Sequence, residues 1–147
     1  MIIEQSSLLC YPGAWTAKRS DKNPWIQADL QTTHRIESVT TQGRESHDQW
    51  VKSYYVSYSQ DGTNWTNISE LYTGNDDRNT KKMNNLPEHI EARYIRLLPN
   101  SWKNHKSMRF DVTGCALHGK NDVNKHKFCH SNSCVSHCRC WVCSPFS

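Results

Sequence analysis

Residues 44–48 hold the densest group of side chains suited to binding chemistry. The group offers a guanidinium, two carboxylates, a hydroxyl and an imidazole, from Arg44, Glu45, Ser46, His47 and Asp48. These groups donate and accept hydrogen bonds, which suits recognition of a polar ligand. The chain carries no G-x-S-x-G, H-E-x-x-H or P-loop signature. We therefore expect a ligand-binding loop in a protein that is not an enzyme and needs no cofactor.

Two flanking segments must position this loop. After it, Tyr54, Val56 and Tyr58 alternate with Ser53, Tyr55, Ser57 and Ser59. A period of two is typical of a strand with one buried face. Together with the β-branched residues before the loop, this pattern predicts a rigid hairpin over residues 40–59 that presents a charged loop at residues 43–49.

The rest of the chain reads as short strands separated by turns. Residues 35–41 are rich in β-branched types, but Ile36 and Val39 are out of phase, so we expect a bulge near residues 37 and 38. Further strands are predicted at residues 25–30, 81–86, 92–98 and 107–115, with polar connections at 18–24, 74–80 and 101–106 and a turn at Pro87. This spacing, without a helix of usual length, predicts an all-β sandwich or barrel.

Composition and charge exclude several protein classes. The chain has 147 residues, a net charge of +4 and a mean hydropathy of −0.84. Residues 1–115 hold 14 basic and 13 acidic residues, a net charge of +1, which argues against a nucleic-acid partner. No apolar run approaches the length of a transmembrane segment, and residues 1–10 do not form a recognisable signal peptide.

Five blocks of sequence resemble the discoidin family, the coagulation factor 5/8 type C domain. They are GAWTAKRSDKNPWIQADL from residue 13, TQGRESHDQWVKSYYVSYSQDGTNW from 41, GNDDRNT from 74, ARYIRLLPNSW from 92 and MRFDVTGC from 108. The resemblance implies a galactose-binding-domain-like jelly roll, an extracellular setting and binding loops at one end. It also implies ligands such as anionic phospholipids, glycans, collagen or receptors, and no catalytic site.

The resemblance suggests three parts of the chain. Residues 1–12 form an atypical lead, residues 13–115 the domain without its first strand and loop, and residues 116–147 an irregular Cys-rich tail that is disordered or disulfide-linked. The family's terminal disulfide would use Cys115. Cys10 is the only upstream cysteine and lies too close to the first block to match the family's partner. Cys10 and Cys115 are therefore disulfide candidates without an assigned pairing.

Within the domain, the resemblance places residues 44–49 in a ligand loop. A charged loop lacks the apolar tip of a membrane-binding loop, which favours a cell-surface glycan or an extracellular protein over phosphatidylserine membranes. Leu9 and Tyr11 are the candidate apolar second loop that the phospholipid alternative requires. The tryptophans expected to pack in the core are Trp15, Trp25, Trp65 and Trp102, and Trp50 is expected beneath the loop. Arg96 and Arg109 are expected to be solvated or paired with carboxylates.

Three weaker signals concern modification and metals. Asn64 and Asn67 begin N-glycosylation sequons. Asp76 and Asp77 suggest a cation site, but the further carboxylates of a calcium loop are missing. A zinc site in the tail is the other alternative, since thiolates are good zinc ligands. Its candidate ligands are Cys129, Cys134, Cys138, Cys140 and Cys143.

Overall fold

A computed structural model of the chain describes residues 2–4 and 13–117, and these residues form strands and connections without a helix. The strands are β1 (Ile2–Glu4), β2 (Trp15–Thr16), β3 (Ile26–Gln42), β4 (Trp50–Ser59), β5 (Thr66–Asn67), β6 (Tyr72–Thr73), β7 (Lys82–Lys103) and β8 (Ser107–Ala116). Among these residues no segment forms a helix long and apolar enough to cross a bilayer. The prediction of an all-β fold is confirmed.

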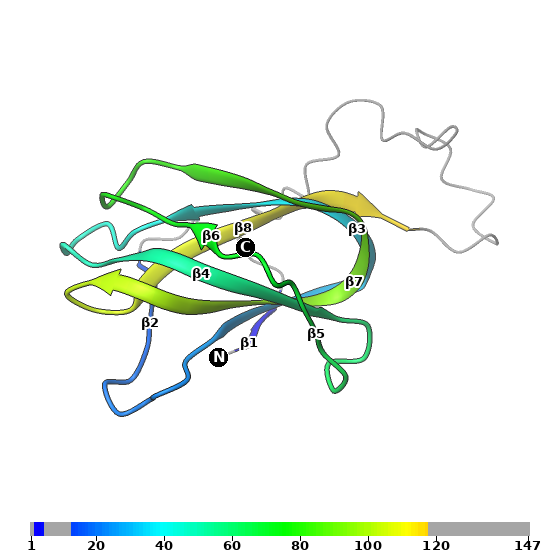
Figure 1. Cartoon of the computed structure of the whole chain (residues 1–147), viewed down its shortest axis with the longest axis horizontal. Coiled ribbons are helices and arrows are strands. Elements are labelled where there is room, and N and C mark those ends of the chain that lie inside the picture. Colours follow the sequence, from blue (N-terminus) through cyan, green and yellow to red (C-terminus); the bar gives the residue numbers. More distant parts are fainter. Residues whose placement is uncertain (1, 5–12, 118–147) are drawn as a thin grey trace, which may run out of the picture.

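The strands form one sheet that folds back on itself. Its order is β2-β8-β3-β7-β4-β5, while β1 pairs with β3 in parallel and β6 pairs with β4. Figure 1 shows β3 and β7 bending at the right-hand side and returning, so that the same strands contribute to both layers of a sandwich. The loops that join the strand ends gather at the left, opposite the bends (Figure 1).

The bend in β3 has a clear local cause. Between Asp29 and His34 the pairing with β7 slips, since the four residues 30–33 of β3 lie opposite the single residue Arg93 of β7. Gln31 adopts a positive φ of 65°, and its N–H donates to Asp29 Oδ1 at 2.8 Å. Arg93 binds the same carboxylate with Nε and Nη2, both at 2.8 Å, which lowers the pKa of Asp29. The bend is therefore held by a two-point ion pair between the two curved strands.

Two predictions concern the middle of β7 and the part of β3 that lies opposite: a turn at Pro87 and a bulge near residues 37 and 38. Pro87 does not start a turn, because β7 continues through it. It lies in the stretch between Asn85 and Ile90 that has no partner in β3, where the missing N–H of proline breaks no ladder bond. Opposite this stretch, the register of β3 shifts between Ile36 and Ser38. The bulge predicted near residues 37 and 38 is therefore confirmed.

The predicted hairpin over residues 40–59 is wrong. β3 and β4 do not pair, because β7 lies between them. β7 pairs with β3 through its residues 82–92 and 94–97, and with β4 through its residues 94–103. Residues 43–49 therefore connect the end of β3, which pairs with the start of β7, to the start of β4, which pairs with the end of β7. The alternation predicted for β4 is confirmed for Tyr54 and Val56, which are fully buried, and for Tyr55, which is exposed. It fails at the end of the strand, where Ser57 and Ser59 are buried.

The core contains one of the four tryptophans expected there. Trp15 is buried, together with Ile26, Ile36, Ile95 and Leu97 among others, whereas Trp102 is 41% exposed. Each fully buried large apolar side chain stabilises the fold by about 1.5–3 kcal/mol. Trp50 is half-buried beneath residues 43–49, as its predicted position requires.

Trp25 and Trp65 are half-buried and hold an arginine between them. The guanidinium carbon of Arg96 lies 4.0 Å from the Trp25 ring centroid and 3.7 Å from that of Trp65. Arg96 Nε also donates to Gln27 Oε1 at 2.7 Å, and desolvation lowers the pKa of Arg96. The expectation of a solvated or carboxylate-paired Arg96 is wrong, because two aromatic faces supply its counter-interaction.

Candidate functional site

Residues 43–49 form a compact loop that is closed by its own hydrogen bonds. Arg44 N–H donates to the Gln49 carbonyl at 2.9 Å, and Arg44 Nη1 donates to Gln49 Oε1 at 2.9 Å. Ser107 of β8 donates to the same amide oxygen at 3.0 Å. Arg44, the first residue predicted to bind ligand, is thus largely engaged in holding the loop closed.

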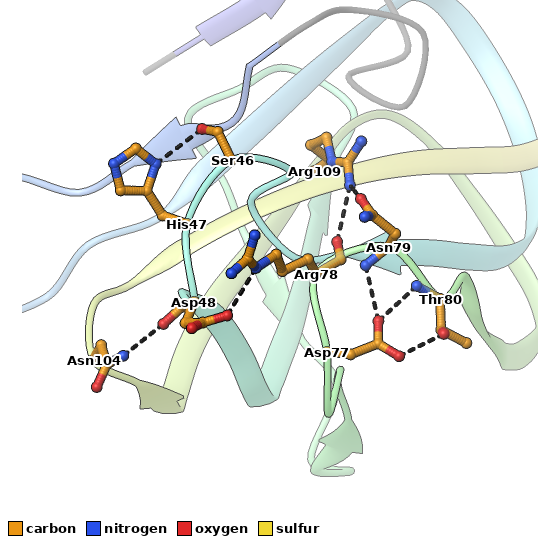
Figure 2. Close-up of polar contacts among 9 residues, drawn as sticks. All are labelled: Ser46, His47, Asp48, Asp77, Arg78, Asn79, Thr80, Asn104 and Arg109. Carbon is orange, nitrogen blue, oxygen red and sulfur yellow. Dashed lines mark hydrogen bonds and ion pairs between the residues drawn. The ribbon is translucent and has the colours of Figure 1, made fainter.

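A second loop, residues 74–81, packs beside the first. Arg78 Nε lies 2.7 Å from Asp48 Oδ1, and Asn104 Nδ2 donates to the Asp48 carbonyl at 2.7 Å, so Asp48 ties three loops together (Figure 2). The hydrogen bond with Arg78 and its positive charge lower the pKa of Asp48. Asp48 is therefore a brace between loops in this structure.

His47, Ser46 and Glu45 occupy the exposed part of the same loop. Ser46 Oγ and His47 Nδ1 are 2.8 Å apart, and Figure 2 shows this pair on the side of the loop away from Arg78. Glu45 is exposed. The structure thus brings the five predicted residues together in one loop and leaves four of them exposed, of which Asp48 is paired with Arg78.

Beneath the two loops lies a buried arginine that sequence reasoning assigned wrongly. Arg109 of β8 is only 5% exposed. Its Nε donates to the Gly43 carbonyl at 2.8 Å, and its Nη2 donates to the Arg78 carbonyl and to Asn79 Oδ1, both at 2.9 Å (Figure 2). One guanidinium thus supplies donors to both loops. No carboxylate is among these partners, contrary to the expectation.

Asn75 makes a similar buried connection. It is 2% exposed, and its Nδ2 donates to the Thr41 carbonyl at 3.1 Å and to the Thr80 carbonyl at 2.8 Å. Its own backbone N–H donates to the Val51 carbonyl at 2.8 Å. The single residue therefore joins the ends of β3, β4 and the second loop. Its sequence context, a polar Gly-Asn-Asp run, gave no signal of burial.

Asp77 shapes the second loop instead of offering a cation site. Its Oδ1 accepts from the backbone N–H groups of Asn79 at 2.8 Å and Thr80 at 2.6 Å, and its Oδ2 accepts from Thr80 Oγ1 at 2.5 Å (Figure 2). These bonds lower the pKa of Asp77. In the part of the chain that the structure describes, no group of three Cys, His, Asp or Glu side chains is placed to hold a metal.

A third and a fourth loop complete this end of the sandwich. The third loop, residues 17–24, and the fourth, residues 102–106, are joined by three hydrogen bonds. Ala17 N–H donates to the Lys106 carbonyl at 3.0 Å, and His105 Nε2 lies 2.8 Å from the Ala17 carbonyl oxygen. Lys106 Nζ donates to the Asp21 carbonyl at 3.0 Å. Lys106 Nζ also lies 4.5 Å from the centroid of the exposed Trp102 ring. We call the surface made by Lys18, Arg19, Lys22, Trp102, Lys103 and Lys106 the cationic face.

The sequence alone did not indicate the cationic face, because its two halves are about 80 residues apart in the chain. Residues 18–22 hold three basic residues within five positions, which was a local signal of charge. Their proximity to Lys103 and Lys106 comes from the pairing of β2 with β8.

The remaining predicted residues lie away from these loops or outside the described residues. Cys115 is buried in β8 opposite Arg35, whereas Leu9, Cys10, Tyr11 and the five tail cysteines lie outside the described residues. Asn64 and Asn67 are exposed. Asn64 Nδ2 donates to Asp61 Oδ2 at 2.7 Å within a tight turn, while Asn67 lies in β5 opposite Ser57.

Comparisons with known proteins agree with this architecture. The F5/8 type C domain model matches residues 6–112. The EGF-like repeat and discoidin I-like domain-containing protein 3 of Mus musculus is 39% identical over 115 residues, which cover 72% of this chain and 24% of that protein. The chain thus spans about a quarter of the length of this curated relative.

Two solved structures have the same fold. Wild-type discoidin II from Dictyostelium discoideum superposes with a TM-score of 0.65 at 33% identity, covering 71% of this chain and 42% of that one. A Clostridium perfringens module, CpGH89CBM32-5, solved in complex with GalNAc-β-1,3-galactose, has a TM-score of 0.56 at 20% identity, covering 66% and 73%, a likeness of fold alone. With the curled sheet, the braced loop end and the matched family model, the chain belongs to the F5/8 type C, or discoidin, domain family.

Proposed function

We propose that this chain is an extracellular recognition module that binds a cell-surface glycan or an extracellular protein through the loops at one end of its sandwich. The observation that carries the proposal is the bracing of that end. Four loops from distant parts of the chain are joined there by Asp48–Arg78, Asn104–Asp48, Arg109 and Lys106–Asp21. Loops held in one arrangement lose little conformational entropy when a ligand binds.

The chemistry of the loop end favours binding of a polar ligand. Its exposed groups are hydroxyl, imidazole, carboxylate, ammonium and guanidinium groups, which form directional hydrogen bonds with saccharide hydroxyls or peptide groups. The fold is also compatible with a saccharide, since the C. perfringens module was solved with a disaccharide.

An extracellular setting is part of the proposal. A relative that carries EGF-like repeats supports it, because such disulfide-rich modules occur in oxidising compartments. The exposure of Asn64 and Asn67, both in sequons, is consistent with it. Mass analysis of the protein secreted from mammalian cells, before and after glycosidase treatment, tests both sites.

The proposal is tested by glycan-array and cell-surface binding of the full chain. We expect Arg44→Ala with Asp48→Ala to reduce binding indirectly, because the double change removes both the bond to Gln49 and the ion pair with Arg78 that hold the loops of this end together. A matched control, Glu37→Ala with Gln60→Ala, changes two exposed residues away from the loop end and leaves binding intact. Thermal unfolding of both variants separates loss of contact from loss of fold. A wild-type chain that binds neither glycans nor cell-surface proteins would refute the proposal.

Peripheral binding to phosphatidylserine membranes is the alternative function, and one observation favours it. Trp102 is 41% exposed and lies beside Lys103 and Lys106, a combination of an interfacial aromatic and cations. Sedimentation with liposomes that contain or lack phosphatidylserine distinguishes this case. Equal pelleting with both liposome types excludes recognition of the anionic lipid.

A further inference from the structure

Charge is divided unequally across the loop end. The cationic face and the rest of its two loops contain five basic side chains, Lys18, Arg19, Lys22, Lys103 and Lys106, and one acidic side chain, Asp21. The two loops beside it carry three basic residues, Arg44, Arg78 and Lys81, against four acidic residues, Glu45, Asp48, Asp76 and Asp77. The loop end is therefore positive on one side and negative on the other.

We propose that the cationic face binds a linear sulfated polysaccharide, so that the ligand of this module is a polyanionic glycan. The inference rests on the proposed function and specifies its ligand class and contact surface. It assigns the binding role to residues of the third and fourth loops, and not to Arg44 and Asp48, which brace their own loops.

Availability of the charges is the first argument. Lys18, Arg19 and Lys22 are exposed, and within residues 2–4 and 13–117 their side chains make no hydrogen bond or ion pair, whereas the charge of the exposed Lys103 helps to lower the pKa of Asp48. By contrast, Arg78 is paired with Asp48 at 2.7 Å, and Arg44 is bonded to Gln49 at 2.9 Å. Exposed, uncompensated cations gain more from a polyanion than cations that already have partners.

Fixed spacing between the two halves is the second argument. The backbone bond from Ala17 to Lys106 and the bond from Lys106 Nζ to the Asp21 carbonyl, both 3.0 Å, hold the two loops against each other. The backbone segments that carry these cations are therefore held at a fixed position relative to each other. A linear polymer with a charge on successive sugars can contact several of the cations at once, and each contact releases counterions.

The surface suits a glycan better than a membrane. Of the five large apolar side chains that are exposed among the described residues, only Trp102 belongs to the cationic face. A single aromatic provides little apolar area for insertion, whereas its ring offers a flat surface to a sugar ring. The carboxylates of the neighbouring loops repel a polyanion and confine it to the cationic side.

The test measures binding of the full chain to immobilised heparin in increasing concentrations of NaCl. The variant Lys18→Gln, Arg19→Gln, Lys22→Gln removes three charges from the cationic face. The control Lys52→Gln, Lys81→Gln, Lys82→Gln removes three charges elsewhere and changes net charge equally. We expect the first variant to bind roughly tenfold more weakly and with a shallower salt dependence, and the control to bind within about twofold of wild type.

Different results of this experiment distinguish failure of the sulfated-polysaccharide proposal from failure of the proposed recognition function. Equal weakening by both triple variants would show that binding follows net charge alone and overturn the assigned surface. Wild-type binding to neutral galactosides but not to heparin would overturn the ligand class while the recognition function stands. Binding to phosphatidylserine vesicles without binding to heparin would overturn it in favour of the membrane alternative. Unchanged unfolding temperatures of both variants confirm that they are folded.

Discussion

The two sides of the loop end use polar residues in different ways. On the side of residues 43–49 and 74–81, the polar groups bond mainly to one another, through Arg109, Asn75, Asp48 and Asp77. On the cationic face, one backbone bond and single bonds from the side chains of His105 and Lys106 join the loops, and most of the charged side chains face solvent. One side is therefore a brace and the other an open surface.

This difference shows that a cluster of functional residue types is not by itself a site. Residues 44–48 offer varied binding chemistry, yet Arg44 and Asp48 stabilise the loops. The residues of the cationic face belong to two ordinary polar segments. Whether a polar side chain is available to a ligand depends on the partners that the fold brings to it.

The largest expected effect concerns Arg109. Arg109→Ala leaves the carbonyls of Gly43 and Arg78 without their donor, so we expect the free energy of unfolding to fall by about 3 kcal/mol. Urea denaturation measures the loss. Arg109→Lys is the control for charge, and it should recover only part of the stability because an ammonium cannot reach three acceptors in this geometry. If Arg109→Ala is as stable as wild type, the brace does not exist as described.

Gly74 is a second position at which a substitution is expected to disrupt the braced side. A Cβ at this position would collide with the Val51 carbonyl, which is backbone and cannot rotate away. We expect Gly74→Ala to destabilise the fold by roughly 1–3 kcal/mol. It should also speed hydrogen exchange at the Asn75 amide, which bonds to the Val51 carbonyl. Unchanged hydrogen exchange at the Asn75 amide would contradict the close approach of the backbone segments around Gly74 and Val51.

A smaller effect separates the two sides by function. Lys106→Gln on the cationic face should weaken heparin binding about threefold, whereas Arg44→Gln should leave it unchanged. Arg44→Gln should instead lower the unfolding temperature, since it loses the bond to Gln49. Surface plasmon resonance and thermal unfolding on the same samples measure both quantities. If Arg44→Gln weakened heparin binding and Lys106→Gln did not, the binding surface would be the side of residues 43–49 and not the cationic face.

The smallest effect is a change in proton binding on the braced side. The pKa of Asp48 is lowered in the folded chain from the ordinary value of 3.8, mainly by Arg78, so the folded state binds fewer protons than the unfolded state. Its contribution to stability is present above pH 3.8 and is lost as the pH falls through the folded value. Arg78→Gln should raise the pKa of Asp48 but leave Asp77 low, because Thr80 and Asn79 hold that carboxylate. Carboxyl NMR titration of both residues checks this difference.

Local pattern located the strand-forming segments, although the predicted strands 25–30 and 35–41 are parts of one strand, β3, and 81–86 and 92–98 are parts of β7. The alternation of Met108, Phe110 and Val112 matches a strand whose buried face they form, and the phase break after Ile36 located the bulge. These features depend on the positions of neighbours along a strand, which the sequence displays directly. The alternation failed for Arg109, which is buried on the other face of β8 because two loops cover it.

Pairing could not be predicted in the same way. Residues 40–59 have the local pattern of a hairpin, but β7 pairs with β3 along one edge and with β4 along the other, and so separates them. Trp102 has the residue type of a core position, yet it lies where β7 ends at the loops. In both cases the outcome depends on contacts with distant parts of the chain.

The sequence by itself determined that this protein is an all-β member of the discoidin family with polar connections at the strand ends, because periodicity, turn residues and family blocks are local properties. Only the tertiary structure decided which connections meet and which of their charges stay exposed. Burial and hydrogen bonding engage Arg109, Asn75 and Asp48, while the pairing of β2 with β8 joins residues 18–22 to residues 102–106. The physical reason is that a side chain's partners are set by long-range packing, which no local spacing encodes.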